Sequence, residues 1–180
     1  MRSALAALAL MSSPALATGI EITVSGEANG VIKIDLLEDV APQHAARIAK
    51  LAADGAYDGV AFHRVIEGFM AQTGDVRCAV EGASCPPGTG GSDEPNLPAE
   101  FSNVPYDRGV VGMARSQNPN SANSQFFIMF AEGYFLNGQY TVVGRVTDGM
   151  DVVDAIKRGS GQSGSVTGTP DRMQKVVATD

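Results

Sequence analysis

Two neighbouring segments of the chain place an arginine and a glutamine among apolar side chains. Arg64 belongs to the first segment, Met70 and Gln72 belong to the second, and a Glu-Gly turn joins them. Because alternate residues of a strand share a face, we expect Phe62, Arg64 and Ile66 on one face. A guanidinium stays protonated and presents several N–H donors in one rigid plane. The pattern fits a binding surface with fixed hydrogen-bond donors, and it fits equally the wall of a sheet whose arginine faces water.

Longer motifs distinguish these two interpretations. Phe62–Asp75 contains Phe-His-Arg-Val-Ile, then Gly-Phe-Met, then Gln, Gly and Asp, and Gly112–Ile128 contains Met-Ala and ends in Ser-Gln-Phe-Phe-Ile. Phe135–Val146 contains a Leu-Asn-Gly turn followed by an apolar run. All three segments resemble the cyclophilin family of peptidyl-prolyl cis/trans isomerases, and the resemblance runs in unbroken order from Glu21 to Val177.

The resemblance implies a role for each matched position. Arg64 is similar to the family's catalytic arginine. The positions that match its substrate-binding residues are Phe69, Met70, Gln72, Ala114, Arg115, Gln125, Phe127, Phe135, Leu136 and Tyr140. The implied activity is isomerisation of X-Pro bonds in proline-containing peptides and in unfolded or folding proteins, with no metal and no organic cofactor.

The residue types suit that reaction. Rotation about a peptide C–N bond crosses a barrier of roughly 18–20 kcal/mol, because resonance gives the bond double-bond character. In the twisted transition state the prolyl nitrogen gains a usable lone pair, so a fixed donor such as Arg64 stabilises that state selectively. Apolar walls would hold the proline ring meanwhile. No base is required, so His63 is interpreted as structural and should point away from the face of Arg64.

Four positions depart from the family pattern. Thr73 stands where the family usually has a second glycine, and Arg115 replaces a common asparagine. Phe135 and Tyr140 occupy the places of a tryptophan and a histidine of many eukaryotic members, and in this they are similar to bacterial members.

A binding module is the competing interpretation of the same residues. In that case the groove holds proline-containing or unfolded segments, and turnover is incidental. The presence of Arg64 favours the enzyme, because aromatic and aliphatic walls alone could form a proline pocket. A purely structural barrel leaves the combination of Arg64, Gln72 and Phe127 unexplained.

Periodicity and turn residues predict a mostly β fold. Short apolar or alternating runs predict strands over residues 20–24, 31–36, 61–66, 69–73, 110–114, 126–130, 142–147 and 173–178. Helices are expected over Pro42–Asp54, which begins with proline, and over Met150–Arg158, which Gly159 should end. With the resemblance, these elements predict a closed eight-stranded antiparallel barrel capped by the two helices.

Both cysteines, Cys78 and Cys85, lie in the irregular stretch Val76–Asn103. A loop that long is usually functional or needs a cross-link. In an exported protein a local disulfide is favoured over free thiols. A zinc site is disfavoured, because neither His44 nor His63 has metal-site spacing to the pair.

Residues 1–17 have the layout of a signal peptide. Arg2 precedes the apolar run Ala4–Met11, and the small residues up to Ala17 supply an A-x-A pattern, so cleavage is expected after Ala17. The run is too short to span a bilayer, although an uncleaved anchor is the alternative. We therefore expect residues 18–180 to form one isomerase domain, which is located in the periplasm or is secreted.

The net charge disfavours some classes of binding partner. The chain has 20 acidic against 13 basic residues, for a formal net charge of −7 at pH 7. This balance argues against nucleic acid and against anionic membranes as partners. We expect a monomer that acts on exported proteins.

Overall fold

The computed structural model describes residues 19–180, which form nine strands, two α-helices and two short 3-10 helices. The strands are β1 (Gly19–Ser25), β2 (Gly30–Leu36), β3 (Val60–Ala61), β4 (Arg64–Ile66), β5 (Met70–Thr73), β6 (Val110–Met113), β7 (Phe126–Met129), β8 (Val142–Asp148) and β9 (Arg172–Thr179). The helices are α1 (Pro42–Ala53) and α2 (Met150–Ala155), with the 3-10 helices η1 (Pro119–Ser121) and η2 (Tyr134–Leu136). The expected signal peptide, with its cleavage site after Ala17, lies outside the described residues.

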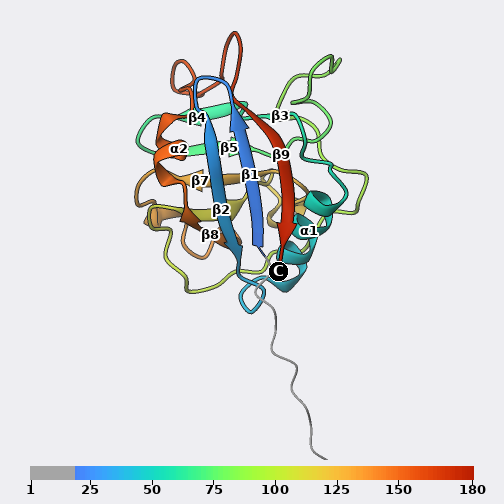
Figure 1. Cartoon of the computed structure of the whole chain (residues 1–180). Coiled ribbons are helices and arrows are strands. Elements are labelled where there is room, and N and C mark those ends of the chain that lie inside the picture. The colour runs from blue at the N-terminus through green and yellow to red at the C-terminus, as the bar shows by residue number, and fades with distance from the viewer. Residues whose placement is uncertain (1–18) are drawn as a thin grey trace, which may run out of the picture.

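All nine strands belong to one curled antiparallel sheet, in the order β3-β9-β1-β2-β8-β6-β7-β5-β4. Figure 1 shows β1, β2 and β9 in front, with β4, β5 and β7 crossing behind them. The hairpin expected over residues 20–36 is confirmed as β1 and β2, which pair from Gly19 with Asp35 to Val24 with Gly30. The prediction of a mostly β fold with two helices is therefore confirmed.

The prediction of a closed eight-stranded barrel is wrong. The strand expected over residues 61–66 is interrupted at Phe62 and His63, which divides it into β3 and β4. These two strands are the edges of the sheet, and no pairing joins them within residues 19–180. Phe62 N–H donates to Asp171 O beside β9 (2.9 Å), whereas His63 N–H donates to Gln72 O on β5 (3.1 Å). The chain thus crosses from one edge to the other, which yields nine strands in an open half-barrel.

Two hydrophobic clusters lie on opposite faces of this sheet. Along β7, Phe126 and Ile128 belong to the inner core, whereas Phe127 and Met129 belong to a smaller second cluster. Alternate residues of a strand point to opposite faces, so the second cluster lies on the outer face. Phe62 is fully buried in the inner core. The expectation that Phe62 shares the face of the arginine is therefore wrong.

Helix α1 packs against β1, β8 and β9 and begins at the expected proline, ending one residue early. Its N-cap residue, Ala41, has no side-chain acceptor. Glu100 of the long loop supplies one, because its Oε2 accepts from the N–H groups of Gln43 and His44 (both 3.1 Å) and contacts His44 Nδ1 at 2.6 Å. Burial raises the pKa of Glu100, but the hydrogen bonds from His44 outweigh this and place the pKa below its ordinary value.

Helix α2 packs against β2 and is shorter than the predicted Met150–Arg158. The N–H of Lys157 donates to the buried Asp171 carboxylate at 2.7 Å instead of continuing the helix. Gly159 does not end the helix; it lies against Gly164, whose carbonyl oxygen would clash with any Cβ at this position. Neither helix of the described chain is long and apolar enough to cross a membrane.

The cap by Glu100 leads to a stability prediction. Glu100→Ala removes the acceptor of two amides at the start of α1, so we expect the free energy of unfolding to fall by about 1–2 kcal/mol in a urea titration. Since the pKa of Glu100 is lowered in the folded state, its contribution is present above the ordinary value of 4.5 and is lost as the pH falls through the folded-state pKa. Glu94→Ala, which removes an exposed carboxylate near Lys50, is the control and should leave the midpoint nearly unchanged.

Candidate active site

Strand pairing places four residues in a row across the outer face of the sheet. Arg64 of β4 pairs with Gln72 of β5, Gln72 pairs with Phe127 of β7, and Phe127 pairs with Gly112 of β6. Directly paired residues point to the same side of a sheet. The guanidinium, the amide and the aromatic ring therefore lie side by side, although the four positions are far apart in the sequence.

Gly112 leaves room for the aromatic floor of this row. A Cβ at Gly112 would lie 2.5 Å from Phe127 Cζ and 2.5 Å from Tyr106 Oη, closer than carbon or oxygen atoms can approach. The rings of Tyr106 and Phe127 stack here with centroids 5.8 Å apart, and the Tyr140 ring meets Phe127 edge-on at 6.0 Å. Any side chain at position 112 would push these rings into the groove.

A cavity of about 280 Å³ opens beside the row. It is lined by Arg64, Phe69, Met70, Gln72, Ala114, Arg115, Phe127, Phe135, Leu136 and Tyr140. Met70, Phe127 and Leu136 are buried and form its apolar floor, whereas Phe135 is 66% exposed at the rim. The Phe69 and Phe135 rings lie 5.5 Å apart. The structure thus brings together all the predicted site residues except Gln125.

Arg64 is held at the side of this cavity by two hydrogen bonds. Its Nε donates to Ser163 O (3.0 Å) and its Nη1 donates to Gln72 Oε1 (3.2 Å), while Nη1 also lies 4.0 Å from Met70 Sδ. Among residues 19–180, Nη2 has no hydrogen-bond partner. Partial burial lowers the pKa of Arg64 from its ordinary value. An arginine nevertheless remains protonated in a protein, so the N–H groups of Nη2 stay available as donors in a residue that lines the cavity.

Gln125 does not line this cavity but contacts Gln72, which does. Its Oε1 accepts from Gln72 Nε2 (3.0 Å), and its Nε2 donates to Gly88 O (3.1 Å) and Gly90 O (2.8 Å). The side chain expected to contact substrate therefore joins the groove to the long loop. Nothing in the sequence pattern around Gln125 indicates these partners, which come from a segment far along the chain.

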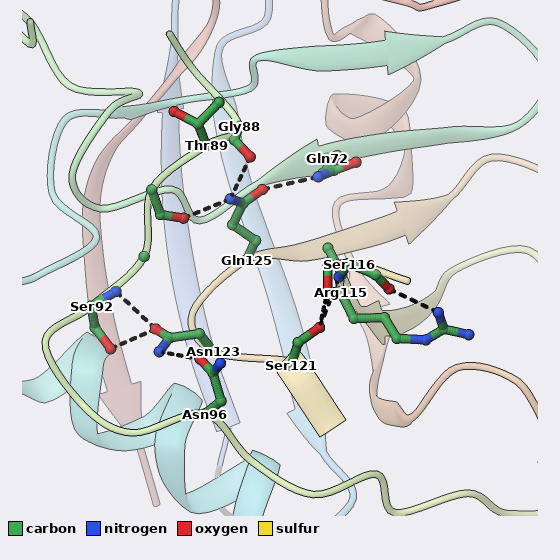
Figure 2. A pocket seen from close by; sticks show the side chains of 13 residues that line it. Gln72, Gly88, Thr89, Ser92, Asn96, Arg115, Ser116, Ser121, Asn123 and Gln125 are labelled. Atoms are coloured by element: carbon green, nitrogen blue, oxygen red, sulfur yellow. Dashed lines mark hydrogen bonds between the residues drawn. The ribbon is translucent and has the colours of Figure 1, made fainter. Parts of the chain in front are cut away.

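A second cavity of about 460 Å³ adjoins the first across Gln72, Ala114 and Arg115. Figure 2 shows it between the loop that carries Gly88 to Ser92 and the segment that carries Ser121 and Asn123. Asn123 Oδ1 accepts from the N–H and the hydroxyl of Ser92 at 2.8 and 2.7 Å. No sequence pattern predicts a site at these polar residues, because their proximity depends on how the loop folds.

Arg115 forms the wall between the two cavities. Its Nε and Nη2 donate to Gln139 O (3.2 and 2.8 Å), its Nη1 donates to Ser116 O (2.9 Å), and its guanidinium carbon lies 4.3 Å from the centroid of the Tyr140 ring. Nη1 also donates to Gln117 O (3.4 Å), so four hydrogen bonds and a stacked ring leave this side chain little freedom. Arg115 therefore has a fixed position along the groove.

His63 is 9% exposed and packs near Gly88 of the loop, where a Cβ would lie 3.3 Å from two of its ring atoms. Burial lowers the pKa of His63, so the ring is neutral at pH 7. Cys78 and Cys85 are joined in a disulfide within the same loop. Within residues 19–180, no cluster of three or more His, Cys, Asp or Glu side chains could hold a metal ion.

Comparisons with known proteins agree with this geometry. Residues 20–178 match the family "Cyclophilin type peptidyl-prolyl cis-trans isomerase/CLD". A "Probable peptidyl-prolyl cis-trans isomerase" of Brucella suis is 54% identical over 192 aligned residues, covering 98% of this chain and 95% of the relative. A peptidyl-prolyl cis-trans isomerase of Helicobacter pylori is 37% identical, covering 72% of this chain and 76% of the relative.

A solved structure agrees as well. The crystal structure of a cyclophilin type peptidyl-prolyl cis-trans isomerase from Cryptosporidium parvum superposes with a TM-score of 0.78 at 26% sequence identity, covering 92% of this chain and 99% of that one. The outer-face groove, the family match and the near full-length relatives lead to one conclusion. This chain belongs to the cyclophilin family and is a peptidyl-prolyl cis-trans isomerase.

Proposed function

We propose that Arg64 is the catalytic hydrogen-bond donor of this isomerase and that the cavity beside it binds the proline of an X-Pro segment. The observation that carries the proposal is the position of Arg64, whose Nη2 has no partner in the described chain while Nε and Nη1 are fixed by Ser163 and Gln72. The structure of the Cryptosporidium relative in the presence of the dipeptide Ala-Pro supports a proline-containing ligand.

The chemistry follows from the barrier to rotation. Resonance keeps the C–N bond planar, and twisting it by about 90° removes the resonance and localises a lone pair on the prolyl nitrogen. A donor aimed at that nitrogen forms a hydrogen bond that strengthens only in the transition state, which raises kcat. Because Arg64 is oriented before substrate arrives, it costs little reorganisation during the rotation.

The remaining residues of the cavity would hold the two sides of the rotating bond differently. Met70, Phe127 and Leu136 form a buried apolar floor that suits a proline ring. The second N–H of Gln72 Nε2 is free to bind the substrate backbone, because the first is donated to Gln125. Rotation about the X-Pro bond requires that the proline ring is held while the carbonyl group of the preceding residue turns freely.

Replacement of Arg64 tests the proposal directly. Arg64→Ala should lower kcat/KM on a short X-Pro peptide by roughly 10²-fold, mostly through kcat, because a donor used only in the transition state is removed. Arg64→Lys should also lose most activity, since an ammonium lacks the planar donor pair. The measurement is a protease-coupled or direct spectroscopic isomerisation assay.

Arg145, whose side chain is half-exposed and does not line the cavity, provides the control, and Arg145→Ala should retain full activity. Full activity in Arg64→Ala would refute the catalytic role. An inactive parent protein that still binds proline peptides would favour the binding module.

The pH dependence of kcat separates this mechanism from proton transfer. Arg64 stays protonated, and burial holds the pKa of His63 below its ordinary value. We therefore expect kcat to vary less than about twofold between roughly pH 6 and 9, after subtraction of the uncatalysed rate. A bell-shaped profile with an inflection near the ordinary pKa of histidine would instead indicate a general acid or base.

We further propose that the protein assists folding of exported proteins in the periplasm or outside the cell. The signal-peptide pattern of residues 1–17 and the Cys78–Cys85 disulfide support export, because such bonds persist in oxidising compartments. Expression of the full chain in a bacterium, followed by fractionation and mass spectrometry, should give a periplasmic product beginning at Thr18. Ala17→Arg should block that cleavage. An uncleaved cytoplasmic product from the parent chain would contradict the proposal.

A further inference from the structure

A buried carboxylate lies immediately after β5, and the mechanism above does not use it. Asp75 is 0% exposed. Its Oδ1 accepts from the N–H groups of Arg77 (3.2 Å) and Cys78 (2.8 Å), and its Oδ2 accepts from those of Gly88 (2.7 Å) and Gly90 (3.0 Å). Four backbone amides thus converge on one side chain, and together they use both oxygens of the carboxylate.

These four amides come from the two ends of the disulfide-closed part of the loop. Arg77 and Cys78 lie where this part begins, Gly88 and Gly90 follow its end, and the Cys78–Cys85 bond joins the two sides. Gly90 packs so closely that a Cβ there would lie 2.4 Å from Asp75 Oδ1 and 2.8 Å from Cys78 Sγ. Asp75 therefore determines where the backbone of residues 88–90 lies.

The carbonyl groups of the same residues hold the polar side of the groove. Gly88 O and Gly90 O accept from Gln125 Nε2, and Gln125 Oε1 accepts from Gln72 Nε2. Gln72 Oε1 in turn accepts from Arg64 Nη1. In both glutamine side chains, the amide oxygen is bonded to one neighbour and the amide nitrogen to the other. A shift of the loop carbonyl groups would therefore disturb each of these hydrogen bonds in turn, as far as Arg64.

We propose that Asp75 is a positioning residue for catalysis, which orients Arg64 through the loop at residues 88–90, Gln125 and Gln72. The proposal rests on the catalytic role of Arg64. Asp75 has no direct contact with the cavity, so it acts only through this hydrogen-bond chain. A carboxylate is required because an asparagine has one acceptor oxygen and would turn an N–H₂ group toward two backbone donors.

The first experiment compares Asp75→Asn with the parent in the X-Pro peptide assay. We expect kcat to fall roughly tenfold with KM changed less than about twofold, because misplacing a donor used only in the transition state leaves ground-state binding intact. The fraction of folded, binding-competent protein is measured in parallel by titration with a proline peptide. The control is Asp58→Asn, whose carboxylate also accepts a backbone N–H, from Val176 at 2.9 Å, but lies outside the groove. Its kcat should match that of the parent.

A double-mutant cycle with Gln125→Ala distinguishes positioning from a general structural role. If Asp75 acts through Gln125, then Asp75→Asn should cost less than about twofold in kcat once Gln125 is alanine. Gly90→Ala offers a second route, because it displaces the loop while Asp75 keeps its charge, and it should reproduce the loss of kcat.

Two results would overturn the inference. One is a full tenfold loss from Asp75→Asn in the Gln125→Ala background, and the other is unchanged kcat in both Asp75→Asn and Gly90→Ala. Arg64→Ala is measured in the same series. If it is fully active, the proposed catalytic role fails; if it is inactive while the Asp75 variant is normal, only the positioning role fails.

Discussion

The pairing of β4, β5, β7 and β6 is the constraint on which the site depends. The inner face of the curled sheet is filled by the main hydrophobic core, so a binding groove can form only on the outer face. There, the register places Arg64 beside Gln72 and Gln72 beside Phe127. A shift by one residue in either pairing would send these side chains to opposite faces. The relative positions of these three side chains are thus set by backbone hydrogen bonds, before any side-chain contact is considered.

Local patterns in the sequence were sufficient to predict most of the elements, whereas the groove residues were predicted from the family resemblance. The signals were the proline at the start of α1, the alternation in β1 and β2, and the glycine turns. Each of them determines backbone conformation within a few residues, and the expected elements are present in the structure. Phe62 shows where this reasoning fails. Alternation assigned it to the face of Arg64, but the chain crosses between sheet edges at Phe62 and His63, and Phe62 enters the core. The predicted end of α2 is wrong for a similar reason, because the N–H of Lys157 donates to the Asp171 carboxylate instead of to a helical carbonyl group.

The loop between β5 and β6 could not be predicted from sequence, since long-range hydrogen bonds determine its course. The family resemblance predicts that Gln125 contacts substrate, but no sequence pattern shows that its Nε2 donates to the carbonyl groups of Gly88 and Gly90. The glycines at these positions look like ordinary turn residues until the position of Asp75 is known. A buried carboxylate that accepts hydrogen bonds from several backbone N–H groups can order a segment that has no regular secondary structure. Without the carboxylate, these N–H groups of the loop would be buried and unpaired.

The arrangement around Arg64 explains how a flexible side chain can act as a fixed donor. A free arginine loses about 2 kcal/mol of rotamer entropy when it is immobilised. In this protein the loss occurs on folding, because Ser163 and Gln72 each accept one of its N–H groups at 3.0 and 3.2 Å. In the proposed mechanism, substrate then meets a donor that is already oriented, and the hydrogen bond formed in the transition state is not weakened by the cost of ordering the side chain. If Arg64 has the proposed catalytic role, stabilisation of the rotating bond therefore depends on the hydrogen bonds that orient Arg64 within the protein as well as on the contacts made to the substrate.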